Sequence, residues 1–183
     1  MSKFVDWIIA RAKKTPYFHL TRSDGSVYMR RWWLLPYNWT GIAVRIHEIV
    51  QSDEDRHPHD HPWWYLSIIL KGGYWEITPC PECDGHEEWR GCLVCNGELE
   101  FKEWYGPGSV LLRRASHFHR LELKTVRGYV REDTGIEVLT SVCTTLFISF
   151  PKIQSWGFLV EGQKVSARDY LLDRFVDTKY RGD

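Results

Sequence analysis

The sequence lacks an excess of charge of either sign and lacks a long apolar run. Its 183 residues carry 24 Lys and Arg against 24 Asp and Glu, so the formal net charge is zero. A neutral chain has no general electrostatic attraction for nucleic acid or for a charged membrane surface, so neither partner is expected. No apolar stretch reaches the roughly 20 residues of a membrane span. Because Met1 to Thr15 is also too charged for a signal peptide, we expect a cytoplasmic protein.

Alternation of strands with helices is missing as well, which excludes the parallel α/β folds. Short segments rich in β-branched and aromatic residues follow one another instead, and Gly, Pro or Asn separates many of them. These strand-like segments are 27–35, 41–50, 63–70, 72–78, 98–104, 108–114, 119–123, 137–150 and 156–160. The pattern predicts an all-β barrel or sandwich, and the length suits a single domain, 1–183.

One amphipathic helix is expected at each end of the chain, at 1–16 and at 166–177. Ser166, with Asp169 three residues later, is expected to cap the start of the second helix. The residues expected to pack the helices onto the body are Phe4, Trp7 and Ile8 in the first and Tyr170, Leu171 and Phe175 in the second.

Cysteine is scarce outside one short segment. Four of the five cysteines, Cys80, Cys83, Cys92 and Cys95, form two CxxC pairs separated by eight residues. Four thiolates at such spacing suit the closed tetrahedral shell of a structural Zn²⁺. Disulfides are the alternative, although a chain without a secretion signal gives them less reason to form. We predict a small zinc knuckle at 80–97.

Three histidines alternate ahead of a strand-like run in the segment HPHDHPWWYLSIIL. His57, His59 and His61 occupy every second position, so an extended chain directs their side chains to one face. Neutral imidazole is the commonest metal ligand in proteins, and neighbouring rings that converge indicate a metal site. The alternative is that these rings line a wet surface.

The same segment resembles the first motif of the cupin superfamily. In HPHDHPWWYLSIILKGG, His59 and His61 match the HxH pair of that motif and Gly72 matches its glycine. Tyr65 stands where a glutamate is usual. The HDHPW core, together with the later WGF segment, is similar to small cupins often carried by bacteriophages.

A later segment, GPGSVLLRRASHFHRLEL, resembles the second cupin motif. Gly108 matches its glycine and His119 its histidine, whereas Arg114 and Ser116 stand where proline and glycine are usual. Both motifs occur in the order that cupins have. The cysteine segment lies between them, where members of the superfamily vary in length.

The resemblance implies a double-stranded β-helix, or jelly-roll barrel, over 40–160, with the zinc knuckle as an insertion. It also implies that the two motif strands face each other across the interior and share one divalent metal, Fe²⁺ or another. The ligands that it implies are His59, His61 and His119. His57 and His117 have the same parity as their neighbours and are expected as outer groups or alternative ligands, or as partly exposed residues at the barrel mouth.

Three further residues are candidates for a catalytic role. Tyr65 is expected to point inward, where its hydroxyl can bind a ligand or can simply pack in the core with a backbone partner. Arg113 and Arg114 are adjacent, so one of them should face inward and could clamp a carboxylate or phosphate. The alternative is that both are solvated at a strand end.

Three classes of function follow. The first is a mononuclear non-haem Fe(II) dioxygenase acting on a small molecule, similar to cupin thiol dioxygenases in its three-histidine centre. The second is a non-catalytic cupin that binds a metal, a ligand or a protein partner. The third is a metal-free enzyme like the sugar-nucleotide epimerases, against which three convergent imidazoles argue, because proton exchange does not need them. Exposed strand edges would allow the homodimers that are common among cupins, and the sequence leaves the oligomeric state open.

Overall fold

Thirteen strands and two helices make up the described part of the chain. The computed structural model describes residues 3–15, 17–22, 24–35, 40–55, 57–82, 92–96, 98–127 and 138–174. In chain order the elements are α1 (Lys3–Ala12), β1 (Tyr17–Thr21), β2 (Val27–Leu35), β3 (Ala43–Ile49), β4 (Tyr65–Lys71), β5 (Tyr74–Pro79), β6 (Glu100–Tyr105), β7 (Val110–Arg113), β8 (Arg120–Leu123), β9 (Thr125–Arg127), β10 (Val138–Thr140), β11 (Cys143–Ser149), β12 (Gly157–Val160), β13 (Gln163–Ser166) and α2 (Ala167–Arg174). Neither α1 nor α2 is long and apolar enough to cross a membrane.

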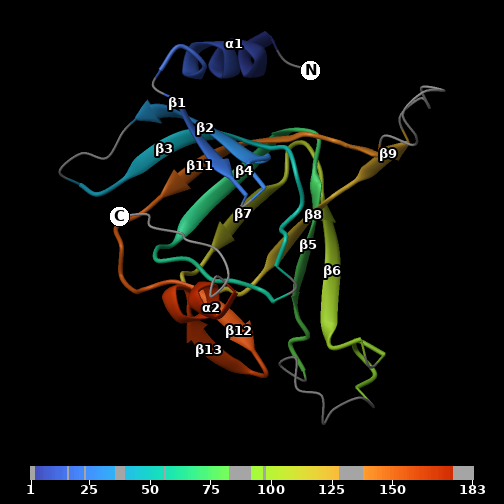
Figure 1. Ribbon diagram of the computed structural model, residues 1–183. Helices are drawn as coiled ribbons and strands as arrows, with labels where there is room; N and C mark the ends of the chain where they lie inside the picture. Colours follow the sequence, from blue (N-terminus) through green and yellow to red (C-terminus); the bar gives the residue numbers. More distant parts are fainter. Residues whose placement is uncertain are drawn as a thin grey trace.

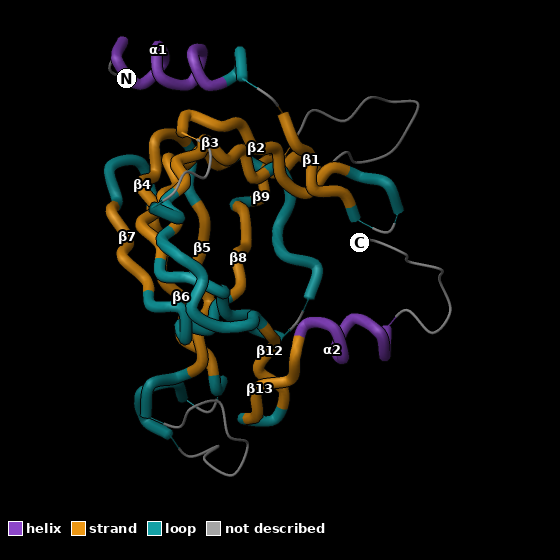
Figure 2. Tube along the Cα trace, turned by 90° about the vertical axis from the view of Figure 1, so that its left-hand side faces the viewer, coloured by secondary structure: helices purple, strands orange, loops and turns teal. Residues whose placement is uncertain are grey.

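Two antiparallel sheets face each other and form the body (Figures 1 and 2). The larger sheet has the strand order β1-β2-β3-β11-β4-β7 and the smaller has β6-β5-β8. Along the chain, β3 and β4 belong to the larger sheet, β5 and β6 to the smaller, β7 to the larger, β8 to the smaller and β11 to the larger. This exchange between two sheets is the topology of a jelly roll. The predicted all-β jelly-roll fold is therefore confirmed.

The core lies between the two sheets, because side chains alternate between the faces of each strand. On β4, Tyr65, Ser67 and Ile69 are buried and point inward, whereas the residues between them are less buried. The main apolar cluster joins both sheets and contains Ile49, Ile69, Tyr74, Leu111, Leu121, Leu123 and Cys143. Polar residues at inward positions are therefore surrounded by apolar walls, which sets the chemistry of the interior.

Helix α1 packs on the outer face of the larger sheet (Figure 1). Ile8 and Ala12, one turn apart, contact apolar side chains of β2 and β3. The expectation that Phe4 and Trp7 also cover the sheet was wrong, since they are 64% and 62% exposed and stack on each other. The buried stripe is centred on Ile8, Ile9 and Ala12, and at 100° per residue Trp7 falls on the other side of the helix.

Helix α2 follows the β12–β13 hairpin, next to the segment that carries the histidines (Figure 1). The hydroxyl of Ser166 accepts a hydrogen bond from the backbone N–H of Asp169 at 3.2 Å, so the expected cap is present. Tyr170 stacks on Phe158 of β12 with ring centroids 3.9 Å apart. Phe175, expected in the same apolar stripe, lies outside the described residues.

Candidate metal centre

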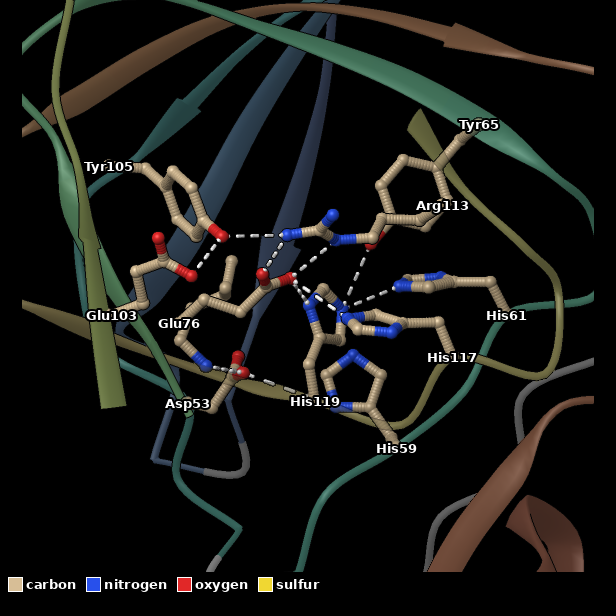
Figure 3. A network of polar contacts seen from close by, with 11 residues as sticks. Asp53, His59, His61, Tyr65, Glu76, Glu103, Tyr105, Arg113, His117 and His119 are labelled. Carbon is tan, nitrogen blue, oxygen red and sulfur yellow. Dashed lines mark hydrogen bonds and ion pairs between the residues drawn. The ribbon is translucent and has the colours of Figure 1, made fainter. Parts of the chain in front are cut away.

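Three imidazoles converge inside the barrel (Figure 3). His59 and His61 lie in the segment that leads from β3 to β4, and His119 immediately precedes β8. One ring nitrogen from each residue lies within 4.8 Å of the others. Nε2 of His61 and Nε2 of His119 are 2.9 Å apart. The structure thus brings together the three histidines that the motifs single out, at a spacing that a single metal ion can bridge.

Backbone pairing holds the first two histidines in place. His59 and His119 exchange two backbone hydrogen bonds, of 2.8 and 3.0 Å, and the N–H of His61 donates to the carbonyl of Ala115 at 3.1 Å. These are isolated contacts and not part of a continuous strand, because β4 begins only at Tyr65. The shared direction of the two rings, predicted from alternation, nevertheless holds, since both line the same cavity.

Asp60 fixes this segment from the opposite side. Its carboxylate is 1% exposed and accepts hydrogen bonds from the backbone N–H of Gly157 at 2.7 Å and from Nε2 of Gln154 at 2.9 Å. Lys164 of β13 donates to it as well. Because three donors already occupy its oxygen atoms, this buried carboxylate holds the backbone in place and is not available as a metal ligand. Asp60 therefore orients His59 and His61 by holding the backbone between them.

Burial keeps two of the candidate ligands, His59 and His61, neutral. Burial lowers the pKa of His59 to about 4, an effect that the nearby Asp53 only partly opposes. The pKa of His61 is held well below its usual range, first by burial and then by His119. Imidazole binds metals in its neutral form, so both rings are in the required state at neutral pH.

Glu76 on β5 is a site residue that the sequence analysis missed. Its carboxylate, in a residue 2% exposed, accepts a hydrogen bond from Nδ1 of His119 at 2.7 Å. Since a carboxylate only accepts, Nδ1 carries the proton and the lone pair of His119 is on Nε2, which faces His61. Such carboxylate–histidine pairs orient metal ligands in many metal sites.

The charge of Glu76 is stabilised from several sides (Figure 3). Arg113 donates to it through Nε at 3.3 Å and through a terminal nitrogen, and Nε2 of His117 lies 3.3 Å from the same carboxylate. Burial alone opposes ionisation, but the hydrogen bonds from His117, His119 and Arg113 outweigh it and hold the pKa of Glu76 far below its usual range. Glu76 is therefore a permanent anion behind His119.

Neither arginine of the predicted pair lines the cavity. The guanidinium of Arg113 is engaged by Glu76 and by the hydroxyl of Tyr105 at 3.1 Å. Arg114 is exposed and lies over the ring of Trp64, 5.8 Å from its centroid. The structure therefore uses Arg113 as an internal partner of Glu76, and a direct catalytic role for Arg113 or Arg114 stays a prediction.

Tyr65 is a packed core residue whose hydroxyl faces the histidine cluster, and its role in binding a ligand stays a prediction. It is 3% exposed and its ring stacks on Phe147 with centroids 5.0 Å apart, as a core residue does. Its hydroxyl also lies 3.4 Å from Nε2 of His119, the atom that would face a metal. Burial, followed by the charge of Glu76, raises the pKa of Tyr65 well above 10, so the hydroxyl keeps its proton and remains a donor.

The two additional histidines take different positions. The ring of His57 meets the hydroxyl of Tyr170 at 2.9 Å and stands outside the cluster of three. His117 forms a second group of potential ligands with Glu76 and His119. Because Arg113 already neutralises Glu76 in that group, a cation there would be repelled by the guanidinium, and the first cluster is the better metal site.

A cavity of about 360 Å³ extends from the three histidines into the barrel. This volume is in the range of small-molecule sites. Residues from both sheets form its walls, and they include Tyr65, Phe147 and Thr145 of the larger sheet and Tyr74 and Leu121 of the smaller. A ligand in this space would be enclosed mainly by aromatic and aliphatic side chains and would reach the imidazoles directly.

The protonation of His47, on β3, is expected to make stability depend on pH. Burial lowers the pKa of its imidazole well below the ordinary 6.5, and the charges of Arg31 and Arg45 lower it further. The folded protein keeps this ring neutral, whereas the unfolded chain gains a proton as the pH falls below 6.5, so stability falls with pH there. The slope from this residue approaches about 1.4 kcal/mol per pH unit. The unfolding free energy of His47→Gln, measured in urea at several pH values, should fall less steeply below pH 6.5 than that of the wild type, by this amount. An unchanged dependence on pH would mean that His47 is not kept neutral by the fold.

Three of the four cysteines of the predicted knuckle come together. The sulfur atoms of Cys80, Cys92 and Cys95 lie within 4.8 Å of one another, and those of Cys80 and Cys92 are 3.8 Å apart. A disulfide needs about 2 Å, so these two residues are not bonded to each other. Cys83 lies outside the described residues. The described part thus brings together three of the four sulfur atoms of the predicted zinc site, which stays a prediction.

Comparisons with known proteins add no family. No protein-family model and no curated protein matches the chain. The polyketide cyclase RemF from Streptomyces resistomycificus is 15% identical, with a TM-score of 0.49 over 90% of this chain and 91% of that one. An RmlC-like cupin protein from Ralstonia eutropha is 14% identical, with a TM-score of 0.48 over 90% and 82% of the two chains.

A third similar structure is an iron protein. The Fe(II) form of HppE is 10% identical, with a TM-score of 0.44; the match covers 75% of this chain and 57% of that one, so the chain spans little more than half of its length. Identities and scores this low transfer neither an activity nor a ligand. The fold assignment therefore depends on the strand order of the chain itself.

Proposed function

We propose that this chain is a cupin whose barrel holds one divalent metal at His59, His61 and His119 and acts on a small molecule as a mononuclear non-haem Fe(II) dioxygenase. The observation that carries this proposal is the convergence of three imidazole nitrogens within 4.8 Å at the wall of a cavity of about 360 Å³. Membership of the cupin superfamily is supported by the two motifs and by the strand order. The finer likeness to small bacteriophage cupins depends on the HDHPW core and the later WGF segment.

The donor set fits such a metal. Three neutral nitrogens on one side leave the remaining coordination positions open, as catalytic sites require. Without a carboxylate among the ligands the positive charge of the metal is not reduced, which favours an anionic ligand such as a carboxylate or thiolate. Tyr65, which stands at the usual glutamate position, adds a neutral hydroxyl in its place.

The chemistry divides between the metal and the chain. When bound, a divalent metal supplies a Lewis acid and, as iron(II), one-electron chemistry with dioxygen. Glu76 holds the proton of His119 on Nδ1 and so keeps Nε2 available as a ligand atom. Tyr65 holds a proton next to Nε2 of His119 and can donate it to a molecule bound there. The apolar cavity walls exclude water and so strengthen these polar contacts.

Oxygen uptake tests the proposal. Protein loaded with Fe(II) should consume dioxygen when a substrate from a panel of small carboxylates and thiols is added, and protein loaded with Zn(II) should not. In Tyr65→Phe the iron content should be unchanged and turnover should fall by about 100-fold, because one preorganised donor is lost. If iron binds but no compound in the panel elicits uptake, the dioxygenase proposal is abandoned for that of a non-catalytic metal-binding cupin.

We propose in addition that Cys80, Cys83, Cys92 and Cys95 bind one structural Zn²⁺, because thiolates grouped in this way form closed zinc shells. In Cys92→Ser the zinc content should fall by one ion per chain, while the barrel stays folded and keeps its own metal. Metal analysis by mass spectrometry, with thermal unfolding of the same samples, measures both. Zinc retained in full by Cys92→Ser, or a thiol titration showing two disulfides in the wild type, would contradict this site.

A further inference from the structure

The cavity has a second polar wall, formed by strand β3. Arg45 and His47 occupy alternate positions of this strand, and both line the cavity with only 4% and 6% of their surfaces exposed. Burying a cation or an imidazole costs folding free energy unless the group is paired or hydrogen-bonded. The metal centre described above uses neither of them.

Arg45 is held rigidly within an aromatic frame. Its guanidinium lies over the rings of Trp33 and Trp63, 4.6 and 5.8 Å from their centroids. A terminal nitrogen donates to the hydroxyl of Ser149 at 3.3 Å. These contacts hold the positive charge of Arg45 at the cavity wall.

Two hydrogen-bonding nitrogens near Arg45 have no partner among the described residues. They are Nε2 of His47 and Nε1 of Trp63, and both are fully buried. Buried polar atoms are almost always hydrogen-bonded, so such an orphan calls for an explanation. An indole N–H can only donate, so the missing partner of Trp63 must be an acceptor.

The electrostatic environment selects a negative acceptor. The charged groups that act on His47 are Arg31, which stands opposite it on β2, and Arg45, and both are cations. Two carboxylates also line the cavity, Asp53 and Asp55. Asp53 is already engaged by the hydroxyl of Tyr28 and by the backbone N–H of Leu121. Neither carboxylate is among the charged groups that act on His47, so the potential at its imidazole is positive.

We propose that Arg45, His47 and Trp63 form a carboxylate-binding subsite, so that the cavity takes a small apolar carboxylic acid. Phe147 stacks on His47 with centroids 4.5 Å apart and on Tyr65 with centroids 5.0 Å apart, so a single ring separates the subsite from the histidine cluster. A short acid with an aryl or alkyl body spans that interval. The acid would react at its other end only if the proposed function is correct. The carboxylate subsite does not depend on that function.

A matched pair of probes tests the subsite in the full-length protein. Phenylacetate and phenylacetamide have the same shape and differ in charge. The wild type should bind the acid at least about 10-fold more tightly than the amide, as measured by NMR titration, because a charge-assisted contact is lost in the amide. Arg45→Met should remove this preference. Arg30→Met, on the outer face of β2 where Arg30 pairs with Glu48 at 3.5 Å, should leave both affinities unchanged.

A second variant decides the matter if Arg45→Met does not fold. Trp63→Phe keeps an aromatic side chain, although a smaller one, and removes the indole N–H. It should therefore weaken phenylacetate by roughly 3–10-fold and phenylacetamide by less, because a carboxylate is the stronger acceptor. Equal affinity of the wild type for acid and amide, an unaltered preference in both variants, or tighter binding of benzylphosphonate than of phenylacetate would overturn the proposal. Repeating the titration in His119→Ala separates the two hypotheses, since a preference for the acid that persists there upholds the subsite whatever the fate of the metal centre.

Discussion

His119→Ala is expected to abolish metal binding in the barrel. The loss of affinity for a divalent metal should exceed the 10–100-fold that removal of an outer partner of a ligand typically causes, because Nε2 of His119 is itself one of three ligand atoms. Competition with a chromophoric chelator measures the affinity. Turnover should disappear with the metal.

His57→Ala is the matched control for this variant. His57 belongs to the same run of alternating histidines but binds the hydroxyl of Tyr170 and lies outside the cluster. Its replacement should leave the metal affinity unchanged. An intact affinity in His119→Ala, or an equal loss in both variants, would mean that the metal is not bound by the predicted three residues.

Glu76→Leu should lower both stability and metal affinity. It leaves the half-buried guanidinium of Arg113 without its carboxylate, and breaking a buried pair in this way costs about 3–5 kcal/mol of unfolding free energy. It also removes the carboxylate that accepts the hydrogen bond from His119. The loss of this partner should lower the metal affinity by about 10–100-fold. Urea unfolding and chelator competition measure the two effects separately. Glu122→Leu, which breaks the exposed pair with Lys102 at 2.8 Å, should change stability by less than about 1 kcal/mol.

The double variant Glu76→Leu/Arg113→Met distinguishes the two roles of Glu76. Replacing both members of a buried pair by apolar side chains is often neutral for stability, so most of the lost free energy should return. Metal affinity should stay low, because the leucine cannot hold the proton of His119. If the double variant regains full metal affinity, Glu76 acts only through folding.

The histidine cluster was predictable because its signal is local. His59 and His61 alternate within three residues, and His119 lies in a second motif whose strand faces them, so one pattern rule and one resemblance were enough. The extended chain assumed for His57, His59 and His61 is not a regular strand, since its backbone is held by isolated bridges and by Asp60. His59 and His61 nevertheless point into the same cavity, as the alternation predicted.

Glu76 could not be identified as a site residue from the sequence alone. Its segment, GGYWEIT, was correctly assigned to a strand, but the partners of Glu76 come from β7 and from the start of β8. The available signal was a charged residue two positions after Tyr74, on the inward face. Arg45 and His47 carry the same signal within GIAVRIHEIV. Polar residues at inward positions of otherwise apolar strands therefore indicate the site where motif matching does not.

Three short strands were also missed. β1, β9 and β13 pair only with a single neighbour each, β2, β10 and β12 respectively. A strand at an edge or in a two-stranded ribbon need not have the alternating apolar pattern from which the other strands were predicted. The central strands, which bury one face or both, were all found from periodicity.

Anomalous X-ray diffraction from crystals grown with Fe(II) or Mn(II) tests the central claim most directly. Data collected at the absorption edge of the metal locate the ion independently of the protein coordinates. One peak per chain in the barrel, bonded at about 2.0–2.2 Å to nitrogens of His59, His61 and His119, is the predicted result. A peak between Glu76 and His117, or no peak in the barrel of a fully loaded protein, would contradict it.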